Sequence, residues 1–232
     1  MRCFLFQSAF GIIDINPYAM KIALILKINN IQHQLTYQPF QNQSPTGLLP
    51  YIIDGNVILA DSAAIVDYLR QQYGLESDKV MDESSVHAWS RLEQLCEIDL
   101  YPIIVHSRML DPSGLKVMTS NKAITDVLNT KESIERSQNK MQQLINASSI
   151  SKFTQEQRYS RGLDILYEIE NTINKGISWL DNKPSTYDAT VYAFLENIHA
   201  IPLPNIMNKY LHDSSIIHGY LTKVKSFFSR QQ

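Results

Sequence analysis

The residues best suited to chemistry lie between Gly47 and Tyr68, where a proline begins one apolar run and an Asp-Ser pair follows the next. Proline at the start of a strand is confined to a sheet edge or a special turn, and its cis form is usually a deliberate feature. A cis Pro50 would leave the backbone groups of Leu49 free to pair with a segment outside the sheet. Asp61 and Ser62 stand where a helix begins, and the unpaired N–H groups of such a turn favour a carboxylate. The stretch therefore predicts an edge for an extended peptide beside a seat for its carboxylate.

The elements that position these residues are a hairpin and a helix. Pro50 to Ile53 and Val57 to Ala60 are short apolar runs separated by Asp54-Gly55-Asn56, and Asp-Gly supplies the positive φ angles of a tight turn. Apolar and aromatic residues then recur at spacings of three and four, at Ile65, Tyr68 and Leu69. This pattern predicts a helix whose first turn is capped by an acceptor side chain.

An earlier strand and helix precede the hairpin. Cys3 to Phe6 has the compact apolar character of a buried strand, and a long, apolar connection follows from Gln7 to Ile15. Asn16 and Pro17 suit the N-cap and first position of a helix that runs to about Lys27. Ile31 to Phe40 contains an extended segment, with Leu35 and Tyr37 facing one way. We expect a right-handed crossover between the first two strands.

Four motifs carry a resemblance to a known family: SAFGIIDINPYAMK, the hairpin LLPYI with ILADS, WSRLEQLCEIDLY, and PSTYDATVYAFL. Together they resemble the glutathione transferases over nearly the whole chain, and more closely the bacterial relatives of the metaxin and failed-axon-connections proteins. The resemblance implies an α/β thioredoxin-like N-terminal domain followed by an all-α C-terminal domain. It also implies a cytoplasmic homodimer that uses glutathione as co-substrate, in a detoxification role.

The resemblance also implies roles for individual residues. The residue before the proline pairs with the cysteinyl backbone of glutathione, which here is Leu49 beside Pro50. The acidic-Ser pair, Asp61 and Ser62, would hold the γ-glutamyl end.

Activation of the thiol is where the sequence departs from the family. Only the thiolate attacks an electrophile, and a free thiol has a pKa of about 8.5, so a transferase aims a donor at the sulfur. The relatives often read Ser-Pro-Phe at the start of the first helix, whereas this chain reads Asn16-Pro17-Tyr18. Asn16 is either an N-cap alone or also an amide donor to the thiolate. Tyr18 and Ser8 are alternative donors.

In this fold the electrophile lies between the first loop and the first long helix of the C-terminal domain, so Phe10, Tyr101, His106 and Arg108 are candidates for its pocket. A lone histidine is more often a hydrogen-bonded structural residue than a metal ligand. The six histidines show no metal-ligand spacing, and we expect no metal site. The Ser, His and Asp residues lie in no nucleophile motif, which disfavours a hydrolase.

The domain boundary is expected at a polar, aperiodic stretch after Gly74. We predict a thioredoxin-like domain at residues 1–76, a linker at 77–84 and an all-helical domain at 85–232. Apolar residues at helical spacing from Ser85 predict a long core helix. A helix pair at the surface is expected between Ser120 and Ile150, and another helix from Thr154 to Leu180, with Ile177 among its core positions. Ser185, three residues before Asp188, predicts a buried capping box.

Composition restricts the partners. The chain has 232 residues and a formal net charge of -2, which offers no general attraction for nucleic acid or an acidic membrane. No apolar run approaches the roughly 18 residues of a membrane helix, so we expect no membrane span. Cys3 and Cys96 lie outside any ligand spacing and are expected to be reduced thiols. Two functions remain: a transferase acting on a small electrophile, or a non-catalytic binding or assembly module of the metaxin-like type.

Overall fold

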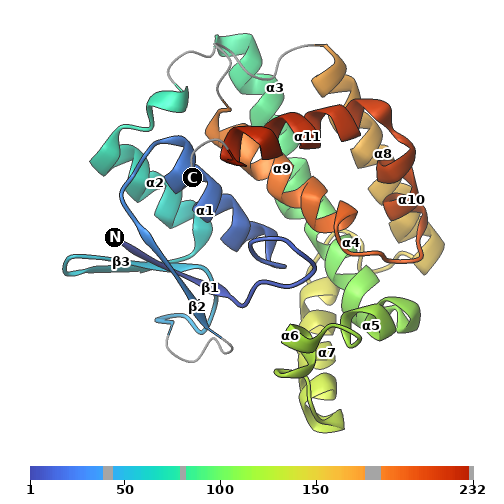
Figure 1. Ribbon diagram of the computed structural model, residues 1–232. Coiled ribbons are helices and arrows are strands. Elements are labelled where there is room, and N and C mark those ends of the chain that lie inside the picture. The colour runs from blue at the N-terminus through green and yellow to red at the C-terminus, as the bar shows by residue number, and fades with distance from the viewer. Residues whose placement is uncertain (39–43, 79–81, 176–183, 230–232) are drawn as a thin grey trace.

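The N-terminal part of the chain is a mixed β-sheet with two helices (Figure 1). The computed structural model describes residues 1–38, 44–78, 82–175 and 184–229. The strands follow the order β2-β1-β3-β4, in which β1 and β2 are parallel and the other pairs antiparallel. Their bounds are β1 Arg2–Phe6, β2 Gln34–Gln38, β3 Tyr51–Asp54 and β4 Val57–Ala60.

The hairpin of β3 and β4 forms where the sequence predicts it. Asp54 pairs with Val57, so the turn has two central residues, and Gly55 takes a φ of 58° that favours glycine. The Leu49–Pro50 peptide bond is cis, as predicted. The extended segment predicted within Ile31 to Phe40 is confirmed as β2, Gln34–Gln38, and residues 39–43, which include Phe40, lie outside the described residues.

Both N-terminal helices begin at side-chain caps. In α1 (Pro17–Ile28) the N-cap is Asn16 and proline occupies the first turn, which satisfies orphan N–H groups without cost. In α2 (Ser62–Tyr73) the N-cap is Asp61, and Gly74 ends the helix in the left-handed conformation. A short 3-10 turn, η1, follows at Glu76–Asp78. Of the predicted linker, residues 79–81 lie outside the described residues, and residue 83 already belongs to the next helix.

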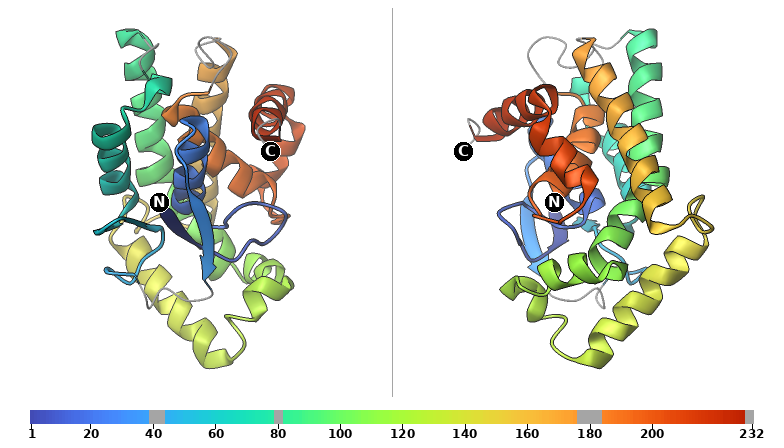
Figure 2. Two further views of the ribbon diagram at one scale, coloured as in Figure 1. Left: turned by 60° about the vertical axis from the view of Figure 1, so that its left-hand side comes forward. Right: turned by 90° about the vertical axis from the view of Figure 1, so that its right-hand side faces the viewer.

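The rest of the described chain is helical. Its α-helices are α3 Glu83–Gln94, α4 Tyr101–Val105, α5 Pro112–Met118, α6 Lys122–Thr125, α7 Lys131–Asn146, α8 Gln155–Asn174, α9 Thr186–His199, α10 Ile206–Asp213 and α11 Ser215–Ser229. The surface pair predicted between Ser120 and Ile150 is the short α6 and the long α7. In both views of Figure 2 these two helices project beyond the rest of the molecule. The predicted continuation of α8 to Leu180, with Ile177, lies outside the described residues.

The predicted long core helix is one continuous helical path that contains both α-helical and π-helical segments. Two π-helical segments, η2 (Leu95–Leu100) and η3 (His106–Leu110), flank α4 within it. Segments of this kind are frequent at functional sites. After η3, Gly114 of α5 packs so closely that an added Cβ would lie 1.7 Å from the carbonyl oxygen of Ser107. Only glycine allows this approach.

Helix α9 is the centre of the C-terminal core, because nearly all of its side chains are buried. Its start is the predicted capping box: Asp188 Oδ2 accepts from the Ser185 backbone N–H at 2.9 Å, and Ser185 Oγ accepts from the Asp188 N–H at 3.2 Å. Helix α1 packs along α9, which joins the two parts of the chain through a shared core. Among the described helices, none is long and apolar enough to cross a membrane.

Candidate functional site

The two parts of the predicted peptide site, Leu49-Pro50 and Asp61-Ser62, lie at the same end of the β3–β4 hairpin. Tyr51, the first residue of β3, pairs with Ala60, the last residue of β4. The residues just outside this pair are Pro50 and Asp61, so the backbone of Leu49 and the start of α2 lie at one edge. Leu49 itself is buried with only 5% of its surface exposed. The hairpin therefore brings together the residues that the sequence assigned to peptide binding.

The start of α2 has an unusual backbone. Asp61 takes a φ of 81°, which is uncommon for a residue other than glycine. Its carboxylate accepts from the N–H groups of Ala63 and Ala64 at 2.9 and 3.2 Å. Ser62 is buried, with 8% of its surface exposed. Positive-φ residues of this kind cluster at ligand sites, and the conformation separates the exposed Asp61 from the buried Ser62.

Asn16 connects α1 to the residue before the cis proline. Its Oδ1 accepts from the Tyr18 backbone N–H at 3.1 Å, which is the predicted cap. Its Nδ2 donates to the Leu49 carbonyl oxygen at 2.9 Å. An amide nitrogen has two N–H donors and a carbonyl oxygen two lone pairs, so each group keeps capacity for one further hydrogen bond. The structure thus joins a predicted thiol donor directly to the predicted peptide edge.

The two alternative thiol donors are already engaged by backbone carbonyls. The Tyr18 hydroxyl donates to the Glu97 carbonyl oxygen at 2.7 Å, and its ring packs edge-on against Tyr101. Burial raises the pKa of this phenol well above its usual value, and the Glu97 carboxylate adds to the effect. Ser8 donates its hydroxyl to the Ile12 carbonyl oxygen at 2.6 Å within the first loop. Within the described part of the chain, neither hydroxyl forms a hydrogen bond to Leu49 or Ser62.

Asp14, which the sequence analysis did not single out, fixes the end of the loop that precedes Asn16. Asp14 is fully buried, and its two oxygens accept from the backbone N–H groups of Phe6 and Asn16 at 2.8 and 2.7 Å. Burial raises the pKa of Asp14 to about 8, although these two donors and the Arg108 guanidinium act in the opposite direction. Asp14 therefore determines where the loop ends and α1 begins.

Arg108, from the helical C-terminal region, forms hydrogen bonds that hold the same loop. Its guanidinium donates to the Ile15 carbonyl oxygen at 2.6 Å, and to the Asn197 backbone and side-chain oxygens at 2.7 and 2.9 Å. Asn197 in turn donates to the Asp14 carbonyl oxygen at 3.1 Å. Burial lowers the pKa of Arg108 to about 10. Arg108 therefore holds the loop that carries Asn16, and its predicted place in a substrate pocket stays a prediction.

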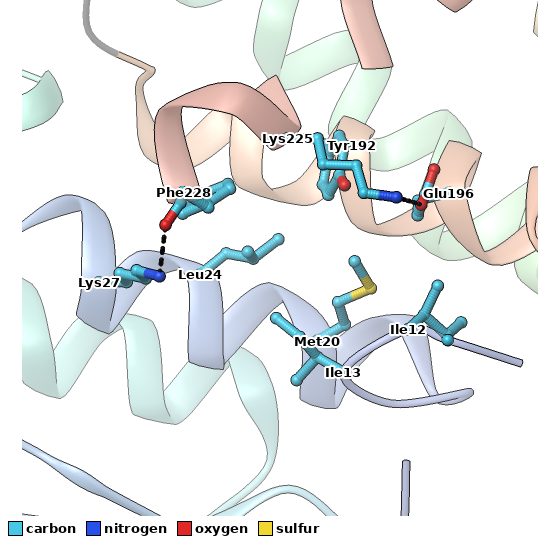
Figure 3. A pocket seen from close by; sticks show the side chains of 10 residues that line it. Ile12, Ile13, Met20, Leu24, Lys27, Tyr192, Glu196, Lys225 and Phe228 are labelled. Carbon is cyan, nitrogen blue, oxygen red and sulfur yellow. Dashed lines mark hydrogen bonds and ion pairs between the residues drawn. The ribbon is translucent and has the colours of Figure 1, made fainter. Parts of the chain in front are cut away.

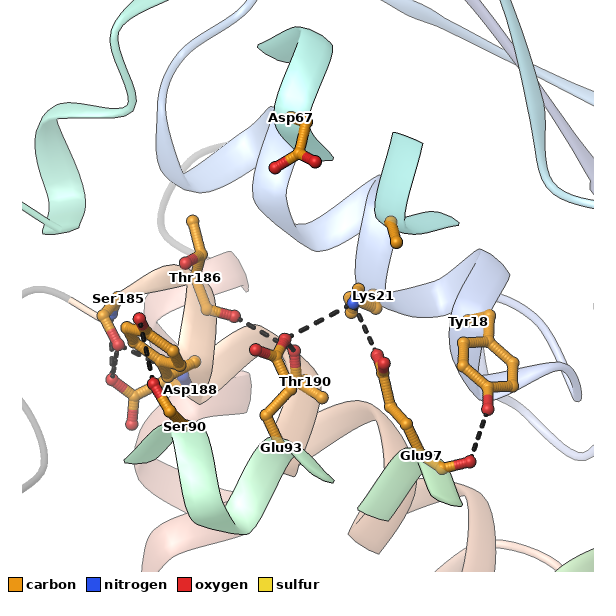
Figure 4. A network of polar contacts seen from close by, with 12 residues as sticks. Tyr18, Lys21, Asp67, Ser90, Glu93, Glu97, Ser185, Thr186, Asp188 and Thr190 are labelled. Carbon is orange, nitrogen blue, oxygen red and sulfur yellow. Dashed lines mark hydrogen bonds and ion pairs between the residues drawn. The ribbon is translucent and has the colours of Figure 1, made fainter. Parts of the chain in front are cut away.

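A second polar network ties α1 to the C-terminal helices (Figure 4). Lys21 is buried, and its ammonium lies 2.5 Å from Glu97 Oε1 and 3.4 Å from Glu93 Oε1. Thr190 of α9 donates to the same Glu93 oxygen at 2.9 Å. Burial raises the pKa of Glu97, and the Lys21 ammonium opposes that shift. The Asp61 carboxylate raises it further, so α2 begins within the electrostatic reach of this network.

The four residues predicted to line an electrophile pocket lie in different surroundings. Phe10 packs with Met118, Ile124, Ile201 and Leu203 in a small separate core. Tyr101 packs against the rings of Tyr18 and Phe194. His106 is buried, with its Nδ1 3.0 Å from an Arg158 nitrogen. Arg108 makes the buried contacts given above. A pocket bounded by the first loop, α1, α9 and α11 is lined by none of the four.

Other reactive groups offer little chemistry. Both cysteines are buried free thiols, and burial raises the pKa of Cys3 to about 12. Within the described ranges no group of three His, Cys, Asp or Glu residues has the arrangement of a metal site. The rings of His199 and His212, from α9 and α10, nevertheless lie against each other with centroids 4.4 Å apart and a tilt of 36°, a contact that no sequence spacing suggested.

Comparisons with known proteins agree with this architecture. A family model described as the glutathione S-transferase N-terminal domain matches residues 17–114, from the start of α1 into α5. No curated protein sequence matches the chain.

Several solved structures share the fold over almost the full length of both chains. The beta-etherase LigF from Sphingobium sp. strain SYK-6 has a TM-score of 0.63 and 12% identity, covering 99% of this chain and 98% of its own. Glutathione transferase GSTFuA2 from Phanerochaete chrysosporium also has a TM-score of 0.63, with 11% identity and coverage of 99% and 97%. Glutathione transferase URE2P6 from the same organism, solved with oxidized glutathione, has a TM-score of 0.56, 12% identity and coverage of 100% and 97%.

These likenesses establish the glutathione transferase fold, which confirms the predicted fold class: a thioredoxin-like sheet followed by a helical region. The chain is glutathione transferase-like. The matches named here are glutathione transferases and a beta-etherase, so the expected likeness to the metaxin branch stays a prediction.

Proposed function

We propose that this chain binds glutathione at the edge formed by Leu49 and the start of α2. The observation that carries the proposal is the pairing of Tyr51 with Ala60, which sets a buried backbone edge beside the N-terminus of a helix. Glutathione is an extended peptide with a carboxylate at its γ-glutamyl end. Its cysteinyl backbone would pair with Leu49, and the carboxylate would accept from Ser62 and the first N–H groups of α2, where the helix dipole favours an anion. Metal is not part of this proposal.

We propose that the Asn16 side-chain amide donates the hydrogen bond that stabilises the glutathione thiolate. A cysteinyl group paired with Leu49 would lie beside the Asn16 amide, which already donates to the Leu49 carbonyl oxygen. The second N–H of that amide would donate to the thiolate and lower its pKa. The thiolate would then attack a small electrophile, forming a carbon–sulfur bond while the leaving group departs with the electron pair. The protein would act as a glutathione transferase in the cytoplasm, where thiols such as Cys3 and Cys96 stay reduced.

Glutathione binding is tested by isothermal titration with a matched pair of serine variants. Ser62→Ala removes a buried hydroxyl from the proposed carboxylate seat, and Ser84→Ala removes an exposed one from the first turn of α3. We expect Ser62→Ala to weaken binding about tenfold, the value of one hydrogen bond to a charged group, and Ser84→Ala to have no effect. Absence of binding by the wild type at millimolar glutathione, or equal affinities for the two variants, would overturn the proposal.

Catalysis is tested separately by conjugation of glutathione to a chloronitrobenzene. Asn16→Ala should lower the rate at saturating glutathione, because it removes the proposed donor. A rate that is unchanged in Asn16→Ala, with glutathione still bound, would remove Asn16 from the chemistry.

The alternative is a glutathione-binding or assembly module without catalysis, of the metaxin-like type. It is favoured by the engagement of the Tyr18 and Ser8 hydroxyls, which leaves a single amide to serve the thiol. Tight glutathione binding together with no conjugation by the wild type or by Asn16→Ser would support this module.

We further propose a homodimer that covers the outer edge of the sheet. Strand β4 is an edge strand, and exposed apolar side chains lie on it and on η2, with Ile58 54% and Ile98 64% exposed. Apolar edges of this kind are normally covered. Ile98→Glu should shift the sedimentation coefficient to that of a monomer, whereas Ile206→Glu on α10 should not. A wild type that sediments as a monomer would refute the dimer.

A further inference from the structure

Three histidines from three different helices meet at the end of α9, and none of them is assigned to the proposed glutathione site. His199 is the last residue of α9, His212 lies in the last turn of α10, and His218 lies in the first turn of α11. The ring centroid of His199 is 4.4 Å from that of His212 and 6.3 Å from that of His218. His199 is half-buried, whereas the other two are exposed. Protons from solvent therefore reach a histidine cluster that joins the last three helices.

Glu196 is the acidic group that faces the histidine cluster, and it also faces a lysine (Figure 3). Its carboxylate lies 3.6 Å from His199 Nδ1 and 3.9 Å from the Lys225 ammonium of α11. Only 6% of Glu196 is exposed, and burial raises its pKa. This carboxylate thus has the charge of Lys225 to balance before any histidine takes up a proton.

The other elements around the cluster carry few charges. On α10 the charged residues are Lys209 and Asp213, one of each sign. Helix α8 presents Glu170, which accepts from the Ser214 hydroxyl at 2.6 Å at the junction of α10 and α11. The connection from α9 to α10, residues 200–205, contains no ionisable side chain. Protonation of three histidines would therefore change this corner from a slight excess of negative charge to an excess of positive charge.

We propose that the histidine cluster is a pH-sensitive contact that holds α10 and the start of α11 against α9 while its rings are neutral, and that releases them when the rings are protonated. Neutral imidazole rings can pack against each other, whereas imidazolium ions at these distances repel. Histidine is the side chain whose charge changes between about pH 5 and 8. The cluster thus makes the packing of the last helices depend on pH.

The direction of the effect follows from His199. Burial, the two other histidines and Lys225 lower its pKa from the usual 6.5. A histidine with a lowered pKa in the packed arrangement binds protons more weakly there than in the released one, so a fall in pH below about 6.5 favours release. The C-terminal end of α11 should stay attached to α1, because the Lys27 ammonium donates to the Phe228 carbonyl oxygen at 2.7 Å.

The test is hydrogen exchange of the full chain at pH 7.5 and 5.5, measured by mass spectrometry and corrected for the intrinsic rate at each pH. We expect α10 and the first turns of α11 to exchange about tenfold faster at pH 5.5. Each like-charge contact of this length in water changes an equilibrium roughly three- to fivefold, and His199 makes two. The double variant His212→Gln/His218→Gln should lose most of the acceleration. His87→Gln, which removes an exposed histidine from α3, is the matched control and should keep it.

The opposing carboxylate gives a second test. Glu196→Gln removes its charge, so the midpoint of release should move to higher pH, and an unchanged midpoint would contradict the proposed contact. Equal corrected exchange rates of the wild type at the two pH values would overturn the proposal. So would a double histidine variant that keeps the full acceleration, or an acceleration that is uniform over all the helices, since that would be general unfolding by acid.

Discussion

Asn16 carries two separable roles, and three side chains at this position distinguish them. In the wild type, Oδ1 caps α1 by accepting from the Tyr18 N–H, and Nδ2 donates to the Leu49 carbonyl oxygen. Asn16→Ser keeps a cap acceptor but is too short to preserve the second bond. Asn16→Ala loses both.

The magnitudes follow from these two bonds. Loss of the bond to Leu49, whose residue is 5% exposed, should cost about 0.5–1.5 kcal/mol of unfolding free energy in Asn16→Ser. Replacement of an asparagine cap by alanine costs about 0.5–2 kcal/mol more. Asn16→Ala should therefore be destabilised by about 1–3.5 kcal/mol in total. Glutathione affinity should fall in both variants, because the Leu49 backbone loses its hydrogen bond to Asn16.

The assay is urea unfolding followed by far-ultraviolet circular dichroism, with glutathione titrations on the same samples. Two results would refute this account. If Asn16→Ser unfolds at the same urea concentration as the wild type, the bond to Leu49 contributes nothing. If Asn16→Ala is no less stable than Asn16→Ser, the cap contributes nothing.

Three further predictions concern stability. Lys21→Met leaves the partly buried carboxylates of Glu93 and Glu97 without their cation, and should lower the free energy of unfolding in urea by about 2–4 kcal/mol. Adding Glu97→Gln to Lys21→Met should restore part of that free energy. Strictly additive effects of the two substitutions would contradict an interaction between Lys21 and Glu97. Gly114→Ala places a methyl group against a backbone oxygen and should cost about 1–3 kcal/mol, whereas Gly219→Ala in α11 meets no atom within 4 Å and should gain up to about 1 kcal/mol. A Gly114→Ala protein with wild-type thermal stability would contradict the close approach. Burial and neighbouring histidines lower the pKa of His199 below its usual 6.5, so protonation favours the unfolded chain and stability should fall as pH drops below about 6.5. His199→Gln should lessen that fall, and identical pH profiles would contradict it.

Local signals were sufficient for the elements of the site. Pro50, the Asp54-Gly55 turn and the caps at Asn16 and Asp61 each act within a few residues of themselves, so their residue types indicate the conformation directly. The capping box of Ser185 and Asp188 was readable for the same reason. Helix bounds were less accurate, because the π-helical segments of the long helix leave no mark in a 3.6-residue period.

Residue type alone could not reveal which polar groups would meet in the core. Arg108 was predicted to line a pocket because the family resemblance places the electrophile between the first loop and the first long helix of the C-terminal domain. The structure shows that it reaches that loop but is buried there, donating to Ile15 across 93 residues of sequence. The pocket beside α11 was missed for a similar reason, since Lys27 and Phe228 are separated by 201 residues.

The sequence by itself determined the hairpin, the caps and the fold class, because these depend on backbone preferences and on apolar periodicity over short distances. Only the tertiary structure decided what Asn16, Tyr18 and Arg108 do. Each of these side chains finds its hydrogen-bond partner on a backbone carbonyl of another element, at Leu49, Glu97 and Ile15. Burial obliges polar groups to find such partners, and the partner available is set by packing rather than by spacing along the chain.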